Sequence, residues 1–168
     1  MQRFPVILAS ALGAAAVLVS PSANAQTFFD RYMVAKAPCF ARAYSTDELR
    51  RKPRQTVTNF FVWHAQPDPR RAENPRTFEI EFGFRVRPSQ RLFTARATCR
   101  DGGGPIACNI EGDGGAFTIE PNGDGLRITI SRVEVEGQKG FSGDLAKGDN
   151  RVMLLISSPL TACSTRIN

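Results

Sequence analysis

The side chains that could perform acid–base chemistry are few and lie apart along the chain. His64 is the single histidine, and it follows Trp63 at the end of an apolar, β-rich run. A histidine that acts as a general base needs a nearby nucleophile or carboxylate, and none stands near it in the sequence. Glu79 and Glu81 share one face of a predicted strand, but their arginine neighbours indicate ordinary surface charges. We therefore expect no catalytic residues.

The glycine-rich segments are a second set of candidates, for metal or phosphate binding. Asp113 and Asp124 each lie between two glycines, as in fragments of calcium loops, but the regular acidic spacing and the closing Glu are missing. A phosphate loop needs a helix N-terminus after its glycines, whereas these glycines join predicted strands and suit tight turns. The cysteines and the histidine also lack the spacing of zinc ligands. The sequence predicts neither a metal nor a cofactor.

The basic residues form two groups that could bind an anion together. The chain has 22 Lys and Arg against 16 Asp and Glu, a formal net charge of +6 at pH 7. Arginine pairs well with carboxylate and phosphate groups, so convergence of the groups would create an anion-binding surface, with a merely solvated face as the alternative. The first group is Arg50, Arg51, Lys52 and Arg54, and the second is Arg70, Arg71 and Arg76.

Residues 1–25 have the three parts of a secretory signal peptide. Arg3 supplies a positive charge, an apolar stretch follows, and Ala23 and Ala25 are the small residues that the peptidase requires. The apolar run is about 16 residues, short of the ~20 that span a bilayer, so a membrane anchor is the weaker interpretation. We expect cleavage after Ala25, a mature domain over 26–168 with no transmembrane segment, and a location in the periplasm or outside the cell. Export makes nucleic acid an unexpected partner.

All four cysteines follow the predicted signal: Cys39, Cys99, Cys108 and Cys163. An even number of cysteines in an exported chain implies disulfides. A turn over 101–105 folds one predicted strand back on the next and sets Cys99 opposite Cys108. Cβ atoms of paired residues lie about 4.5–5.5 Å apart, close to the spacing that a disulfide requires. This pairing leaves Cys39 to bond Cys163.

One short helix is predicted among the elements that must position these residues. Ser45 and Glu48 form a capping box, and the helix over 46–52 that it begins is ended by Pro53. Residues 26–44 are ambiguous, because their apolar side chains could also line one face of a short helix. Those side chains are Phe28, Phe29, Tyr32 and Met33.

Strands are indicated by alternation of apolar and polar residues. The clearest covers 77–87, a half-buried antiparallel strand. A four-residue loop to the strand over 92–100 predicts Val86 opposite Phe93, Phe84 opposite Ala95, Phe82 opposite Ala97, Ile80 opposite Cys99 and Glu79 opposite Arg100. Further strands are predicted over 55–65, 106–110, around Phe117 and Ile119, over 126–135, and over 152–156.

Two of these strands have special features, and together the strands predict the fold. The alternation changes phase at Ser131-Arg132, which indicates a β-bulge. Residues 152–156 are apolar on both faces, which favours a deeply buried strand. Seven or eight hairpin-linked strands with one helix form a single mainly-β domain. We expect a small antiparallel barrel, closed or nearly so, with a two-sheet sandwich as the alternative.

A resemblance adds to this description. The segment Pro38-Cys39-Phe40, the residues Leu49, Pro53 and Gln55, and the later Cys-x8-Cys and Gly-Asp-Gly-Gly pieces resemble small, uncharacterised β-rich proteins that bacteria secrete or keep in the periplasm. The resemblance implies a periplasmic location and carries over no catalytic residue.

The predicted function is that of a monomeric, non-enzymatic binding or interaction module. Its expected partner is a protein or an anionic ligand of the cell envelope, contacted through loops, as is usual for such scaffolds. The alternative is an inhibitor of a secreted hydrolase, either lysozyme-like or a protease. A hollow interior would instead indicate a small lipophilic ligand, and a pocket that holds Glu79 or Glu81 with His64 would indicate a hydrolase.

Overall fold

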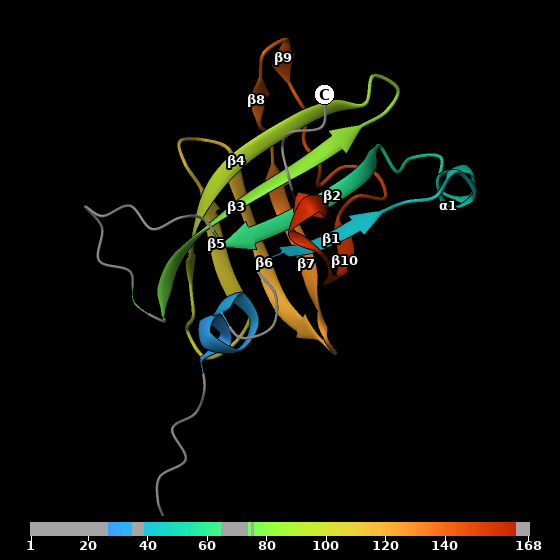
Figure 1. The fold of residues 1–168 in the computed structure, drawn as a ribbon. Coiled ribbons are helices and arrows are strands. Elements are labelled where there is room, and N and C mark those ends of the chain that lie inside the picture. Colours follow the sequence, from blue (N-terminus) through green and yellow to red (C-terminus); the bar gives the residue numbers. More distant parts are fainter. Residues whose placement is uncertain (1–26, 35–38, 65–73, 75, 164–168) are drawn as a thin grey trace, which may run out of the picture.

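Eight antiparallel strands close into a barrel in a computed structural model that describes residues 27–34, 39–64, 74 and 76–163. The order around the barrel is β1-β10-β7-β6-β5-β4-β3-β2, so the seven consecutive strands β1 to β7 form a meander that β10 closes between β7 and β1 (Figure 1). The predicted closed barrel is confirmed, and the sandwich alternative is wrong. The barrel strands are β1 (Cys39–Ala43), β2 (Val57–His64), β3 (Thr77–Val86), β4 (Arg91–Arg100), β5 (Ile106–Ile110), β6 (Gly115–Asn122), β7 (Gly125–Val133) and β10 (Val152–Ser157).

Phenylalanine rings fill the interior of the barrel. The Phe82 ring lies 5.9 Å from that of Phe60 and 5.3 Å from that of Phe117, and Phe84 stacks on Phe93 at 5.4 Å. All five side chains are buried in one core cluster that also takes in aliphatic residues of β2 to β7 and of β10, and the Phe40 ring of β1. Close-packed aromatic rings account for the stability of such a core. The interior is therefore a core, not a chamber for a lipophilic ligand.

A short helical turn, η1 (Phe29–Val34), packs at one end of the barrel (Figure 1). Phe28 stacks on Tyr32 at 5.0 Å and on Phe78, at the start of β3, at 6.1 Å. The Tyr32 hydroxyl donates a hydrogen bond to the carbonyl of Gly123, in the β6–β7 turn. The helical option for this ambiguous segment is confirmed, whereas β1, which begins at Cys39, has no counterpart among the predicted strands.

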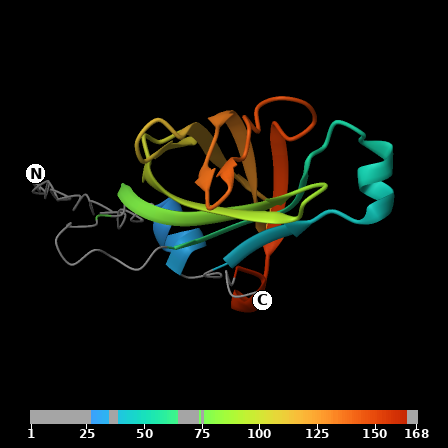
Figure 2. The same cartoon turned by 90° about the horizontal axis from the view of Figure 1, so that it is seen from above.

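The predicted helix is present as α1 (Thr46–Arg51), and its capping box is confirmed. The Ser45 hydroxyl accepts from the Glu48 amide at 3.3 Å, and the Glu48 carboxylate accepts from the Ser45 amide at 2.9 Å. Glu48 also pairs with the Arg42 guanidinium. Seen from above, α1 and η1 lie at opposite ends of the barrel (Figure 2).

The predicted register of the β3–β4 hairpin is wrong by two residues. Phe84 pairs with Phe93 rather than with Ala95, and the predicted pairs of Val86, Phe82 and Ile80 shift in the same way. The predicted Glu79–Arg100 pair is replaced by Glu81–Arg96 on the outer face. A shift by two keeps every side chain on its own face, so the pattern of the strands could not expose the error. The loop is 87–90 rather than 88–91, with Gln90 at a φ of 52°.

Both predicted disulfides are present. Cys99 lies directly opposite Cys108 in the β4–β5 ladder, with their Cα atoms 4.0 Å apart. The second bond joins Cys39 of β1 to Cys163 of η2 (Leu160–Cys163), with a Cα–Cα distance of 5.9 Å. It holds the short 3-10 turn η2 against the outside of the barrel, where both sulfurs belong to a second, smaller apolar cluster.

The bulge predicted near Ser131 is confirmed. Phe117 pairs with Ile130 while the adjacent Ala116 pairs with Arg132, so Ser131 is the additional residue on β7. Past the end of β7 the chain forms a small hairpin from β8 (Glu136–Gly137) and β9 (Gly140–Phe141). This hairpin falls inside a polar, glycine-rich segment in which the sequence predicts no strand.

The prediction that 152–156 is buried on both faces is wrong. Met153 and Leu155 of β10 point into the core, but Leu154 is 48% exposed and Ile156 is 62% exposed. β10 lies in the wall of a single-layer barrel between β7 and β1, and no described element covers its outer face.

The predicted signal peptide, residues 1–25, lies outside the described residues. None of the helices that the structure describes is long and apolar enough to cross a membrane.

Candidate functional site

The barrel wall is incomplete along one half of β4. β4 has ten residues but its neighbour β5 has only five, so the β4–β5 ladder covers only Ala97 to Arg100. One more hydrogen bond, from the Glu111 amide to the Arg96 carbonyl at 3.4 Å, ends this contact. Among the described residues, the half of β4 that leads from the β3–β4 loop therefore has β3 on one side and no paired strand on the other.

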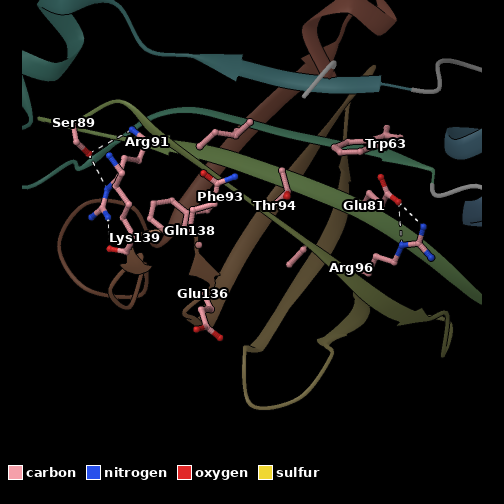
Figure 3. Close-up of a pocket in the computed structure, with 13 residues that line it drawn as sticks. Trp63, Glu81, Ser89, Arg91, Phe93, Thr94, Arg96, Glu136, Gln138 and Lys139 are labelled. Carbon is pink, nitrogen blue, oxygen red and sulfur yellow. Dashed lines mark hydrogen bonds and ion pairs between the residues drawn. The ribbon is translucent and has the colours of Figure 1, made fainter. Parts of the chain in front are cut away.

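The β8–β9 hairpin lies beside this gap, and no pairing of it with β4 is seen among the described residues. Gly137 approaches the Phe93 ring so closely that a Cβ at position 137 would be 2.9 Å from the ring. The Arg91 guanidinium donates to the Lys139 carbonyl at 2.8 Å, and its centre lies 5.5 Å from that of the Phe93 ring. These contacts hold the hairpin beside the first residues of β4 (Figure 3).

A groove with a volume of about 1160 Å³ remains between the hairpin and the outer face of the β3–β4 pair. This volume exceeds the ~300–1,000 Å³ that is usual for small-molecule sites. Side chains from β2, β3, β4, the β3–β4 loop and the β8–β9 hairpin border it (Figure 3). The residues that line the groove include Trp63, Glu81, Arg91, Leu92, Thr94, Ala95, Arg96, Glu136, Gln138 and Lys139.

One row of the sheet forms the far end of the groove. Trp63 pairs with Glu81 across β2 and β3, and Glu81 pairs with Arg96 across β3 and β4. The Arg96 guanidinium donates to the Glu81 carboxylate through two nitrogens, at 2.8 and 3.0 Å. These hydrogen bonds and the carboxylate charge raise the pKa of Arg96, so the guanidinium is a fixed cation. Arg96 remains 47% exposed, which leaves it open to a ligand.

The aromatic part of the groove is supported by a small cluster on the outside of the barrel. Trp63 stacks on Phe61 with ring centres 5.5 Å apart, and Leu92 packs against the same cluster. The Phe61 ring occupies the space above its cross-strand partner Gly83, which has no side chain. A Cβ at position 83 would come within 2.6 Å of the ring. The Trp63 side chain is therefore held in place while part of its surface faces the groove.

The groove has mixed charge. Arg91, Arg96 and Lys139 contribute cations, and Glu81 and Glu136 contribute carboxylates. Such a surface suits a ligand that has both charged and polar groups better than it suits a polyanion. A rigid aromatic side chain beside hydrogen-bonding groups is typical of recognition sites.

The candidate acid–base residues do not meet in this groove. Only Glu81 of the three borders it, and its carboxylate is paired with Arg96. His64 lies at the end of β2, where its ring meets that of Phe29 edge-on at 4.9 Å. Glu79 is half-buried on β3, opposite Thr98.

The structure separates the described members of the two basic groups. Arg50 pairs with Asp47 within α1, and Arg54 pairs with Asp149, each at 3.2 Å. Arg76 precedes β3 at the end of the barrel that carries η1, whereas α1 lies at the other end. Arg51 and Lys52 are exposed at the end of α1. Arg70 and Arg71 lie outside the described residues, so the predicted convergence is not seen among the described members.

The groove itself has no motif in the sequence. It arises from the unequal lengths of β4 and β5 and from the approach of a hairpin that is distant along the chain. The one advance signal is Trp63, a large aromatic residue at the end of a strand and the only tryptophan of the chain. Within the described residues, no group of three or more His, Cys, Asp or Glu side chains could hold a metal ion.

Comparison with known proteins adds no candidate function. No family model, curated protein or solved structure matches this chain.

Proposed function

We propose that this protein is a non-enzymatic binding module of the cell envelope and that its ligand lies in the groove beside β4. The observation that carries the proposal is the half-unpaired β4, which opens a groove of about 1160 Å³ in the wall of an otherwise filled barrel. Sites of this kind combine a rigid scaffold with a few placed polar groups.

The scaffold supports this proposal through its rigidity. One disulfide joins β4 to β5, and the other joins β1 to η2 on the outside of the barrel. The stacked ring pairs Phe84–Phe93 and Phe61–Trp63 hold the two walls of the groove. A groove that is ordered in advance binds without a large cost in conformational entropy. Two disulfides are also compatible with a location outside the cytoplasm, and we place the protein in the periplasm.

Trp63 supplies a direct test, because the single tryptophan borders the groove. The probes are a library of random linear peptides and an array of soluble oligosaccharides, each screened on the immobilised domain. Probes that bind are then titrated in solution while the Trp63 emission is recorded. We expect a saturable change in emission that Arg96→Ala weakens about ten-fold, as for loss of a charged hydrogen bond.

The matched control is Arg127→Ala, which removes an exposed arginine that pairs with Glu120 on the β6–β7 ladder, away from the groove. We expect this variant to bind every probe as the native protein does. The proposal is wrong if no probe changes the Trp63 emission, or if Arg127→Ala and Arg96→Ala weaken binding equally.

The β3–β4 loop favours inhibition of a secreted hydrolase as a second candidate. Pro88, Ser89 and Gln90 are exposed at the tip of a hairpin that projects past the barrel (Figure 1). The Arg85 guanidinium donates a hydrogen bond to the Gln90 backbone carbonyl at 2.9 Å. The Thr58 hydroxyl donates a second one to the Gln90 side-chain oxygen at 2.8 Å. A loop that is tethered in this way loses little entropy when it enters an enzyme cleft.

Rate measurements separate this candidate from simple binding. Lysozyme and a serine protease are assayed with an excess of the protein and with its Ser89→Glu variant. Slower hydrolysis that the variant restores would support inhibition through this loop. Unchanged rates would rule out inhibition of these two enzyme classes.

A further inference from the structure

We propose that the ligand is an extended polypeptide segment of a partner protein, which adds as a strand to the open edge of β4 at Leu92 and Thr94. This inference rests on the proposed function and states the chemistry of its ligand.

The alternation of an antiparallel ladder decides which backbone groups point outward. Successive residues of a strand direct their N–H and C=O groups to opposite sides. The Arg96 backbone carbonyl accepts a hydrogen bond from the Glu111 amide on the β5 side. The backbone N–H and C=O groups of Arg96, and of every second residue from it along β4, therefore point away from β3. Leu92 and Thr94 are such residues, and their backbone groups therefore point toward the groove.

These backbone groups have no partner among the described residues. The β4–β5 ladder stops at Ala97, and β8 pairs only with β9. No described backbone or side-chain group bonds the N–H or C=O of Leu92 or Thr94 on this side. An open strand edge of this kind is a template for another strand, and proteins usually cover it or block it. In the part of the chain that the structure describes, this edge has no proline and no paired strand.

The pattern of donors and acceptors selects the occupant. Leu92 and Thr94 present N–H and C=O pairs at the two-residue spacing of a strand, which only another extended polypeptide backbone matches along its length. An oligosaccharide has hydroxyl groups without this fixed alternation. Edge addition is a recurring way in which domains bind peptides, with main-chain hydrogen bonds giving affinity and side-chain pockets giving selectivity.

The side chains along the edge indicate what the added strand carries. Phe93 and Ala95 point to the inner side of the sheet, and Ala95 is small and half-exposed. An apolar side chain of the added strand fits beside Ala95. On the outer side the strand passes Thr94 and the Arg96 cation, where a polar or acidic residue suits it.

The test uses the full mature domain and the linear peptides that bind it, with Trp63 emission as the readout. In the first arm, each peptide is remade with a single N-methyl group at successive positions. A methyl group removes one N–H, so strand addition predicts that every second position weakens binding about ten-fold and that the intervening positions have little effect.

In the second arm, Thr94→Pro removes the N–H that faces the groove, and Thr94→Ser is the matched control that keeps it. The Thr94 N–H makes no bond to β3, and proline is tolerated on open edges, so the variant should fold and keep both disulfides. We expect Thr94→Pro to weaken peptide binding about ten-fold and to weaken it far more than Thr94→Ser, which keeps the backbone N–H.

The outcomes separate the two proposals. Peptide binding that Arg96→Ala weakens, but that shows no two-residue pattern and survives Thr94→Pro, overturns strand addition and leaves the binding module intact. Binding of oligosaccharides alone has the same consequence. If neither class of probe binds at the groove, both proposals are wrong. Should Thr94→Pro fail to fold, the N-methyl pattern on the native domain still decides.

Discussion

The Phe61 ring lies over Gly83, its cross-strand partner, so closely that a Cβ at position 83 would stand 2.6 Å from the ring. This contact fixes the ring on the outer face of β3, where it stacks on Trp63. Trp63 in turn borders the groove. The glycine therefore helps to position the aromatic side chain of the candidate site.

Gly83→Ala should disturb this arrangement. The added methyl group pushes the Phe61 ring outward, which we expect to cost about 1–3 kcal/mol of unfolding free energy as overpacking and to shift the Trp63 emission. Gly102→Ala is the control, since nothing lies within 4 Å of a Cβ at that position. Thermal unfolding and emission spectra check both variants. Equal behaviour of the two would show that Phe61 does not depend on Gly83.

The two disulfides should differ in their contribution to stability. Cys39 and Cys163 are 124 residues apart, and Cys99 and Cys108 are nine apart. On the chain-entropy model, replacing the first pair by serine costs about 5 kcal/mol and replacing the second costs about 2.5 kcal/mol. Urea unfolding of the two double variants measures the difference. A larger loss from the short loop would mean that native-state packing, not loop closure, governs these bonds.

The capping box of α1 should make the helix sensitive to acid. Hydrogen bonds from the Ser45 backbone and hydroxyl, with a smaller contribution from Arg42, hold the pKa of Glu48 below its ordinary value of 4.5. The stabilisation is therefore complete above the unfolded pKa and is lost as the pH falls through the lower folded pKa. NMR shifts of the Leu49 and Lys52 amides, which bond within this helix, should report its loss.

Glu48→Gln is the matched control for the acid effect, because glutamine retains the capping geometry without the charge. The stability difference between native and variant should be larger near neutral pH than in acid. An identical acid transition in the two proteins would exclude Glu48 as its origin.

The features that the sequence predicts correctly are those that local pattern decides. Ser45 and Glu48 stand at capping-box spacing, and alternation of side chains places the strands. The Cys99–Cys108 bond follows from a short turn between two such strands. Each of these depends on residues within about ten positions, so neighbouring residues contain the needed information.

The errors come from choices that local pattern leaves open. Phe84 can face Phe93 or Ala95 with the same inward orientation, so only the geometry of the turn selects the register. The groove depends on β5 ending at Ile110 while β4 continues past it, and on the polar hairpin at Gly137 reaching back to Phe93. Contacts between segments so distant in the chain have no signal in a single sequence.

The Asn150 side chain connects the start of β2 to the loop that precedes β10, and we expect this connection to be essential for stability. It is 2% exposed, its side-chain oxygen accepts from the amides of Thr56 and Val57 at 2.9 Å, and its nitrogen donates to the Thr56 hydroxyl and the Lys147 carbonyl. Asn150→Ala leaves buried groups without partners, which we expect to cost about 2–4 kcal/mol. Chemical denaturation measures it.

Asn150→Asp is the informative comparison, because it keeps the two accepted bonds and loses the two donated ones. We expect an intermediate loss of stability at neutral pH. If Asn150→Ala were as stable as the native protein, the loop would be held by its other contacts, such as the Arg54–Asp149 pair.

Substitutions on opposite faces of β10 should differ sharply. Leu155 is 1% exposed within the core and Leu154 is 48% exposed on the outer face, although both belong to one apolar run. Leu155→Ala leaves a cavity, which should cost about 2–5 kcal/mol, whereas Leu154→Ala should cost no more than about 1 kcal/mol. Urea unfolding of the two variants distinguishes these values. A loss of stability at Leu154 as large as that at Leu155 would mean that the outer face of β10 is covered in solution. The apolar sequence of 152–156 predicts such a cover, but no described element of the barrel supplies it.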